Sequence, residues 1–245
     1  TGFADSKLRI KADSDGTPLE IATLTYVQVS DNIYQEVYAT STGEGPFSWI
    51  LGGVYFRDSS GMSPYSTTYS AAVSLGGVVG AQSVSRTRPT ILTDSYAVYG
   101  QGTYAFNEEW KITLGGRYTS EKKDYSSRVG ATVFTYLANE ATFEQFTPNL
   151  VIQYQPSSRL NLYAKAGQAF KSGVFNASAT NAAGTKPVNP ETVTQYELGM
   201  KSDPTNWLRL NVAAYYTDYK DLQSNVRDPI TLSSGLQNAG GAKIY

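Results

Sequence analysis

The stretch TDSYAVYGQGTYAF (residues 93–106) alternates between two kinds of side chain along its length. Apolar or small residues occupy the even positions, whereas Ser95, Gln101 and Thr103 fall on odd ones. Because successive side chains of a β-strand point to opposite faces, this pattern predicts a strand with one apolar and one polar face.

The alternation resumes after the short polar segment formed by residues 107–109. Over residues 110–121, one face carries tryptophan, isoleucine, leucine and tyrosine, and the other carries lysine, threonine, arginine and glutamate. Two such strands joined by a tight polar turn predict a β-hairpin.

This hairpin unit recurs along the chain. Further strand pairs are predicted at residues 33–42 with 47–58, at 145–154 with 160–170, and at 194–201 with 208–216. The first of these fits less well, since its second strand is apolar on both faces. We predict about nine strands in all, with a tenth beginning at Ala242.

The connections between strands alternate in length. Short turns are predicted at residues 43–46, 107–109, 156–158 and 203–206, and long polar loops at about 59–92, 125–140, 172–190 and 221–238. Outer-membrane barrels have this asymmetry, with tight turns at one end and long loops at the other. The pattern therefore favours an all-β, antiparallel transmembrane β-barrel over the alternative, an aromatic-rich soluble β-sandwich.

The composition agrees with this fold and narrows the function. The chain has 245 residues, of which 19 are tyrosine and 22 glycine. Its net charge is -1 without a basic patch, so nucleic acid is not an expected partner. It contains neither cysteine nor histidine. The usual nucleophile–histidine sites and imidazole-ligated zinc sites are therefore excluded, and we expect no enzymatic activity, cofactor or metal centre.

Hydropathy is compatible with membrane insertion through strands. No apolar run reaches the 18 or so residues of a membrane helix, and the mean hydropathy is -0.33. A membrane barrel places its apolar residues at alternate positions, which keeps the average hydropathy low.

Large aromatic residues gather beside the predicted short turns. Such residues ring the membrane interfaces of outer-membrane barrels. The predicted interfacial girdle consists of Trp49, Phe106, Trp110, Tyr154 and Trp207.

Three consecutive stretches carry a family resemblance. YAKAGQAFKSGVFN (residues 163–176), NPETVTQYELGMKSD (189–203) and LRLNVAAYYTDYKDLQ (208–223) resemble the barrel of TonB-dependent outer-membrane receptors. In that family a Gly-Phe-Lys-Ser-Gly stretch precedes a loop, and this chain has Ala169 where the first glycine often stands.

The resemblance implies a barrel of 22 strands filled by an N-terminal plug. Residues 1–245 are then part of one transmembrane β-barrel domain, and the plug and the remaining strands lie outside this chain. The implied function is active uptake, across the bacterial cell outer membrane, of a scarce siderophore-like, corrinoid or saccharide ligand. The implied partners are outer-membrane lipid and, through the plug, the inner-membrane TonB complex.

Parity assigns candidate ligand-facing residues to the lumen of the barrel. They are the polar residues on the face opposite the apolar one: Arg117, Lys165, Glu197, Lys201, Arg209 and Tyr215. They could contact a plug or a substrate, or pair with one another. After Lys171, we expect Gly173 to let the chain leave the strand through its conformational freedom.

Two other functions fit the same strands. One is a passive diffusion channel, and the other is a non-transporting surface binding or scaffold component of an envelope complex. Only active uptake requires the proton gradient.

Overall fold

The computed structural model describes residues 1–13, 22–63, 65–69, 83–130, 133–227 and 234–245. In these ranges the chain is almost entirely β-strand, and the single helical element is a 3-10 turn, η2 (Ala182–Thr185). No helix in the described part is long and apolar enough to cross a membrane. The predicted all-β antiparallel fold is confirmed.

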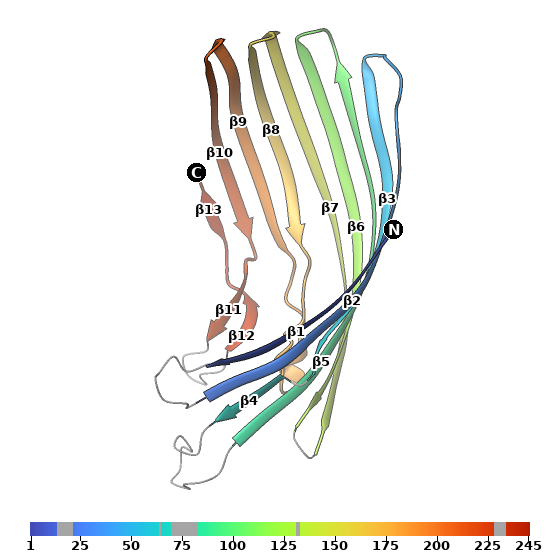
Figure 1. Cartoon of the computed structure of the whole chain (residues 1–245), viewed down its shortest axis with the longest axis vertical. Helices are drawn as coiled ribbons and strands as arrows, with labels where there is room; N and C mark the ends of the chain where they lie inside the picture. The colour runs from blue at the N-terminus through green and yellow to red at the C-terminus, as the bar shows by residue number, and fades with distance from the viewer. Residues whose placement is uncertain (14–21, 64, 70–82, 131–132, 228–233) are drawn as a thin grey trace.

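The strands form one tall, curved wall (Figure 1). Along the wall they follow the order β1-β2-β3-β5-β6-β7-β8-β9-β10-β13, and neighbouring strands are antiparallel. The strands are β1 (Gly2–Asp13), β2 (Ala22–Thr40), β3 (Phe47–Met62), β4 (Tyr65–Tyr69), β5 (Ser83–Ala105), β6 (Trp110–Val129), β7 (Thr135–Ser157), β8 (Leu160–Lys171), β9 (Glu191–Thr205), β10 (Leu208–Lys220), β11 (Gln223–Arg227), β12 (Ser234–Asn238) and β13 (Ala242–Ile244). The described wall is an open sheet, with β1 and β13 at its edges.

The two faces of the wall differ in exposure. On one face, Val98, Leu114 and Leu198 are more than 60% exposed, whereas Ala97 and Thr119 on the other face are 5% exposed. Side chains converge on the concave side of a curved sheet and spread apart on the convex side. We therefore call the face of Val98 the outer face and the face of Ala97 the inner face.

The strands on one side of the wall are longer than the sequence pattern predicts. Residues 83–92 belong to β5 rather than to a loop, and β6 and β7 replace most of the predicted loop at 125–140. Here polar residues occupy both faces, so alternation is not visible in the sequence. Cross-strand pairing nevertheless continues to Thr87 opposite Val129 and satisfies the backbone hydrogen bonds.

The strand β4 lies within the predicted loop at residues 59–92. It pairs with both β2 and β5, beyond the point where β3 ends. The predicted loop is therefore wrong over these residues, and residues 70–82 lie outside the described part of the chain.

The tight turns lie at one end of the wall (the top in Figure 1). The turns predicted at 43–46 and 107–109 are confirmed, since β3 begins at Phe47 and β6 at Trp110. The other two predicted turns overlap the observed ones but begin two to three residues too early, because β7 continues to Ser157 and β9 to Thr205. Pro204 is tolerated there because it lies at the end of a strand.

The loop at residues 172–190 is confirmed, and it folds over the inner face. Phe175 stacks on Tyr125 of β6 with 5.5 Å between ring centroids, and Leu137 and Ala179 complete a buried cluster. The Asn139 side chain donates a hydrogen bond to the backbone carbonyl of residue 185 at 2.9 Å. This loop covers the inner face at the end opposite the tight turns.

The role of Gly173 differs from the predicted one. Among the described glycines only Gly130 and Gly240 have positive φ, so Gly173 is not needed for a left-handed conformation. A Cβ atom at this position would overlap the ring of Phe143 and the carbonyl of Val188. Glycine is therefore required here for close packing.

The β11–β12 hairpin is attached to the loop at 172–190 by side-chain amides. Gln223 donates to the carbonyls of Ser172 and Asn189, at 2.9 Å each. Asn238 donates to the carbonyls of Asn189 at 3.0 Å and Asp221 at 2.7 Å, and its Oδ1 accepts from the Asn189 backbone N–H at 2.9 Å. We call Asn189, Gln223 and Asn238 the amide latch.

Candidate functional site on the inner face

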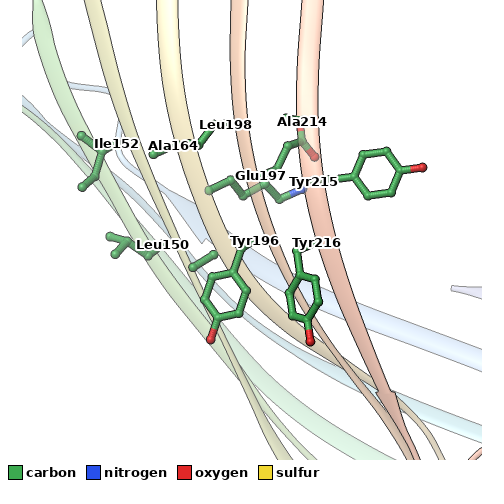
Figure 2. A pocket seen from close by; sticks show the side chains of 11 residues that line it. Leu150, Ile152, Ala164, Tyr196, Glu197, Leu198, Ala214, Tyr215 and Tyr216 are labelled. Carbon is green, nitrogen blue, oxygen red and sulfur yellow. The ribbon is translucent and has the colours of Figure 1, made fainter. Parts of the chain in front are cut away.

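Three of the predicted lumen residues lie in one row on the inner face. Lys165 of β8 lies directly opposite Glu197 of β9, which in turn lies opposite Tyr215 of β10. Figure 2 shows Tyr215 pointing away from the side on which Tyr196 and Tyr216 lie. The register thus brings together a cation, a carboxylate and a phenol from neighbouring strands.

Glu197 is held in place by a tyrosine from the adjacent strand. The Tyr163 hydroxyl donates to Glu197 Oε1 at 2.6 Å, and Lys201 Nζ lies 5.9 Å from the centre of the Tyr163 ring. The ring lies across Gly199, where a Cβ atom would overlap it. We call Tyr163, Glu197, Gly199 and Lys201 the Glu197 cluster.

A second carboxylate on the inner face is held in the same way. The Tyr34 hydroxyl donates to Glu36 Oε2 at 2.8 Å, and the Tyr99 hydroxyl donates to Oε1 at 2.7 Å. The Tyr99 ring lies across Gly52, where a Cβ atom would approach it to 2.5 Å. We call Tyr34, Glu36, Gly52 and Tyr99 the Glu36 cluster.

The sequence alone did not reveal the Glu36 cluster. Tyr99 lies on β5 and Glu36 on β2, with β3 between them, so their contact depends on two strand registers. The one visible signal is Gly52, which lies directly opposite Tyr99. A glycine directly opposite an aromatic residue on the neighbouring strand leaves room for the aromatic ring to lie flat on the sheet.

Arg117 lies beside the Glu36 cluster. It is the direct cross-strand partner of Tyr99, and its Nε donates to Thr119 Oγ1 at 3.1 Å. The structure therefore places this predicted residue on the inner face but apart from the row of Lys165, Glu197 and Tyr215.

Arg209 has a different environment from the other predicted residues. Its Nε donates to Asp203 Oδ1 at 2.7 Å and its Nη2 to Oδ2 at 3.2 Å, next to the tight turn between β9 and β10. Such a bidentate pair fixes the geometry of the guanidinium group. Arg209 therefore stabilises a turn, and it does not join the inner-face clusters.

The described residues include no group of three or more histidine, cysteine, aspartate or glutamate side chains that could hold a metal ion. The two inner-face carboxylates described above instead accept hydrogen bonds from phenols. The chemistry that this face offers is hydrogen bonding and charge.

The predicted girdle residues lie at the tight-turn end of the wall. Trp110 and Tyr154 face each other across β6 and β7 and stack with 4.4 Å between centroids. Phe106 is 60% exposed and Trp207, within the last tight turn, is 82% exposed. Trp49, near the start of β3, is also exposed, and lipid contact for these residues stays a prediction.

The outer face is hollowed between β7 and β10. The small residues Ala164 and Ala166 line an apolar groove of about 460 Å³. Leu150, Tyr196 and Leu198 also line it, and Figure 2 shows these three side chains around Ala164. This groove continues the apolar outer face.

Comparison with known protein families matches nearly the whole chain. The family described as "TonB dependent receptor-like, beta-barrel" matches residues 3–245.

Individual relatives share the fold at lower identity. The chain is 29% identical over 131 residues, 53% of its length, to the metal-pseudopaline receptor CntO of Pseudomonas aeruginosa (strain UCBPP-PA14), and it spans 18% of that protein. The ferric yersiniabactin uptake receptor FyuA of Yersinia pestis superposes with a TM-score of 0.79 at 18% identity, over 98% of this chain and 34% of FyuA. The siderophore receptor PiuA of Acinetobacter baumannii gives 0.69 at 15% identity, over 98% and 39%.

Proposed function

Because this chain belongs to the TonB-dependent receptor-like β-barrel family, we propose that it forms part of the wall of a receptor that actively imports a scarce small-molecule ligand. The receptor binds its ligand outside the cell, and energy relayed by the inner-membrane TonB complex drives passage through the barrel. The match over residues 3–245 is the observation that carries this proposal.

The family is one of bacterial outer-membrane receptors, and this chain is an outer-membrane protein. The outer face supports a lipid environment, since Val98, Leu114 and Leu198 are apolar and exposed along the middle of the wall. In water such a surface would favour association, whereas in a bilayer it lies against acyl chains.

We propose that the ligand is a metal ion held by a small organic chelator. CntO is named for metal-pseudopaline and FyuA for ferric yersiniabactin, and PiuA is a siderophore receptor. These names favour a metal chelate over a corrinoid or a saccharide. The metal here is cargo and requires no metal-binding residue in the wall.

We propose that the inner-face row of Lys165, Glu197 and Tyr215 contacts a plug domain or the passing ligand. Glu197, Lys165 and Tyr215 form a row that presents both charges and a hydroxyl. Arg117 of β6, beside the Glu36 cluster, adds a further cation to the same face. Charged groups on a surface that excludes bulk water form stronger hydrogen bonds than in solution.

The plug and the remaining barrel strands are proposed to belong to the same polypeptide. The chain spans about a third of FyuA and less than a fifth of CntO. The intact mass of the natural protein tests this point. A mass well above the 26.6 kDa of these residues is expected, and a mass near that value would contradict it.

Uptake measurements in cells test the function itself. A strain lacking the gene is grown under metal limitation with a panel of chelates, and accumulation of each labelled metal is compared with and without a protonophore. Accumulation that needs both the gene and the proton gradient is expected. Accumulation that survives the protonophore would mean a passive channel, and no gene-dependent accumulation would favour a scaffold.

A further inference from the structure

Two arginines face each other on the outer face, near the end of the wall opposite the tight turns. Arg88 of β5 is the direct cross-strand partner of Arg128 of β6, which lies opposite Tyr136 of β7. Like charges directly opposite each other in a sheet destabilise the pair unless an anion lies between them.

An aromatic ring fixes both guanidinium groups. The ring centre of Phe134 lies 5.4 Å from Cζ of Arg88 and 5.9 Å from Cζ of Arg128. Guanidinium groups stack readily on aromatic rings, and the stacking leaves their N–H groups free to bind in the plane. The two arginines are thus held in place beside one ring.

These arginines differ from two other cations of the same face, Lys122 and Arg57. Lys122 contacts Glu140 at 2.9 Å and Asp124 at 3.2 Å, and hydrogen bonds to these carboxylates raise its pKa. Arg57 lies 3.7 Å from Asp94. Within the described part of the chain, neither Arg88 nor Arg128 has an acidic partner, and Nη1 of Arg88 is buried without any hydrogen-bond acceptor. A buried guanidinium N–H without an acceptor is costly, so a bound anion would stabilise it.

A groove of about 450 Å³ lies over the two arginines. Besides Arg88, Arg128 and Tyr136, its lining includes Thr90 and Ser126, which add hydroxyl groups. Its volume is in the range of ligand pockets, which run from about 300 to 1,000 Å³, and exceeds what a bare phosphate needs. Bidentate cations beside hydroxyl groups suit a phosphorylated sugar.

The height of the groove above the membrane distinguishes between possible sources of the phosphate group. Tyr118 is the last large apolar residue on the outer face of β6, and Arg128 is ten positions further along that strand. Ten residues span about 33 Å of strand, or roughly 25 Å above Tyr118 after a tilt near 40°, and between Tyr118 and Arg128 the outer face of β6 carries Lys122 and Asp124. The headgroup layer of an ordinary phospholipid is only about 5–8 Å deep on each side. A phospholipid phosphate does not reach the groove, whereas a phosphate on a long, sugar-bearing headgroup does.

We propose that Arg88 and Arg128 form a binding site for a phosphorylated sugar of an outer-leaflet glycolipid. The phosphate bridges the two guanidinium groups, and the sugar occupies the groove along Thr90, Ser126 and Tyr136. The site lies on the outer face of the wall and is therefore separate from the route of the cargo. It anchors the extracellular part of the long strands to the surrounding leaflet.

Binding by the full-length receptor in detergent tests the proposal. The probes are lipopolysaccharide with phosphorylated core sugars, the same material after enzymatic dephosphorylation, phosphatidylglycerol vesicles, and soluble glucose 1,6-bisphosphate. We expect the phosphorylated lipopolysaccharide to bind most tightly. The double variant Arg88→Gln/Arg128→Gln loses two charge-assisted contacts. It should therefore bind phosphorylated lipopolysaccharide about tenfold or more weakly, and its binding of the dephosphorylated material should not change.

The matched control is the double variant Arg57→Gln/Lys122→Gln. It removes the same charge from the same face, but from residues that already have acidic partners. We expect it to bind like the wild type, and we expect both variants to retain metal uptake. Equal weakening of lipopolysaccharide binding in both double variants would show that binding depends on net charge alone, and it would contradict a specific site at Arg88 and Arg128. Equally tight binding of the soluble bisphosphate or of phosphatidylglycerol would overturn the glycolipid as its occupant.

A measurement on the wild-type protein covers the case in which the double variant does not fold. Phenylglyoxal modifies accessible arginines, and mass spectrometry reports the extent at Arg128. Phosphorylated lipopolysaccharide should slow modification of Arg128 but not of Arg209, and the dephosphorylated form should protect neither. Unchanged modification of Arg128 would contradict the proposal.

Discussion

The Glu36 cluster and the Glu197 cluster use the same device in two parts of the wall. In each, a tyrosine ring lies flat across a glycine of the neighbouring strand, and its hydroxyl donates to a glutamate on the inner face. Removing the Cβ atom allows the ring to approach the backbone, which brings the phenol within reach of the carboxylate. The aromatic ring also covers the backbone at the glycine, which has no side chain of its own to shield it from solvent.

The two clusters differ in how many hydrogen bonds the carboxylate accepts. Both oxygens of Glu36 accept from phenols, one from its own strand and one from two strands away. Among the described residues Glu197 accepts one side-chain bond, from Tyr163, and its direct neighbours across the strands are Lys165 and Tyr215.

This difference separates a structural carboxylate from one that is free to bind. The phenols occupy both oxygens of Glu36 and join β2 to β5 across β3. Glu197 retains an oxygen that a donor from a plug or ligand can approach. We therefore expect substitutions in the Glu36 cluster to affect stability and those in the Glu197 cluster to affect both stability and transport.

The largest effects are expected from adding a methyl group beneath each ring. Gly52→Ala and Gly199→Ala force the overlapping ring to move and should each lower the free energy of unfolding by about 1–3 kcal/mol. Gly199→Ala should cost more, because Glu197 then loses its one phenol. Urea unfolding of the refolded receptor, followed by the heat-modifiable band on gels, measures this change.

Two neighbouring glycines serve as controls for these substitutions. A Cβ atom at Gly53 would lie 3.7 Å from its nearest neighbour, and one at Gly167 would lie 3.9 Å away, both ordinary contacts. Gly53→Ala and Gly167→Ala should therefore unfold like the wild type. Equal losses at all four glycines would show that ring packing is not the cause.

The second-largest effect is expected on ligand uptake, where Glu197 and Glu36 should respond differently to loss of their charge. Glu197→Gln removes a charge from the inner face. If the proposed ligand contact exists, loss of a charged hydrogen bond corresponds to roughly a tenfold fall in apparent affinity for uptake. Glu36→Gln should leave uptake near the wild-type level, since both oxygens of that residue already bind the wall. Metal accumulation at several chelate concentrations tests the pair, and a larger loss for Glu36→Gln would reverse the assignment.

Removal of single hydroxyl groups should give a smaller, unequal response. Tyr163→Phe leaves Glu197 without its phenol and should lower the free energy of unfolding more than Tyr99→Phe does, because Tyr34 still holds Glu36. Unfolding of both single variants and of Tyr34→Phe/Tyr99→Phe gives the comparison. Equal costs for the two single variants would argue that the second phenol contributes nothing.

The smallest effect is expected at Lys201. Its ammonium lies 5.9 Å from the Tyr163 ring centre, a distance at the outer limit of a cation–π contact. Lys201→Met should lower stability by at most about 0.5 kcal/mol. A loss as large as that of Tyr163→Phe would mean that Lys201, and not the phenol, positions the ring.

The sequence predicted the parts of the fold that are set by alternation. The strands around residues 96–104, the hairpin turn before Trp110 and the family assignment are confirmed, because one face must be apolar where the wall meets lipid. Parity also placed Lys165, Glu197 and Tyr215 on one face, and the structure brings them into one row.

The parts of the fold and of the site that the sequence did not predict depend on strand register or on pairing between polar strands. The extension of β5 back to Ser83 was missed because outside the bilayer both faces of a strand contact water, so its sequence resembles a loop. The Glu36 cluster was missed because the Tyr99–Glu36 contact crosses an intervening strand. Parity alone predicts a lumen position for Arg209, because alternation carries no information about its local partner Asp203.

The amide latch has a consequence for motion at the end of the wall opposite the tight turns. Because Gln223 and Asn238 bond the backbone of the loop at 172–190, this loop and the β11–β12 hairpin open together or not at all. Their amide protons should exchange with deuterium at one common rate, as a single cooperative unit. An antibody whose binding displaces either segment would therefore displace both. Phe175 would then lose its contact with Tyr125.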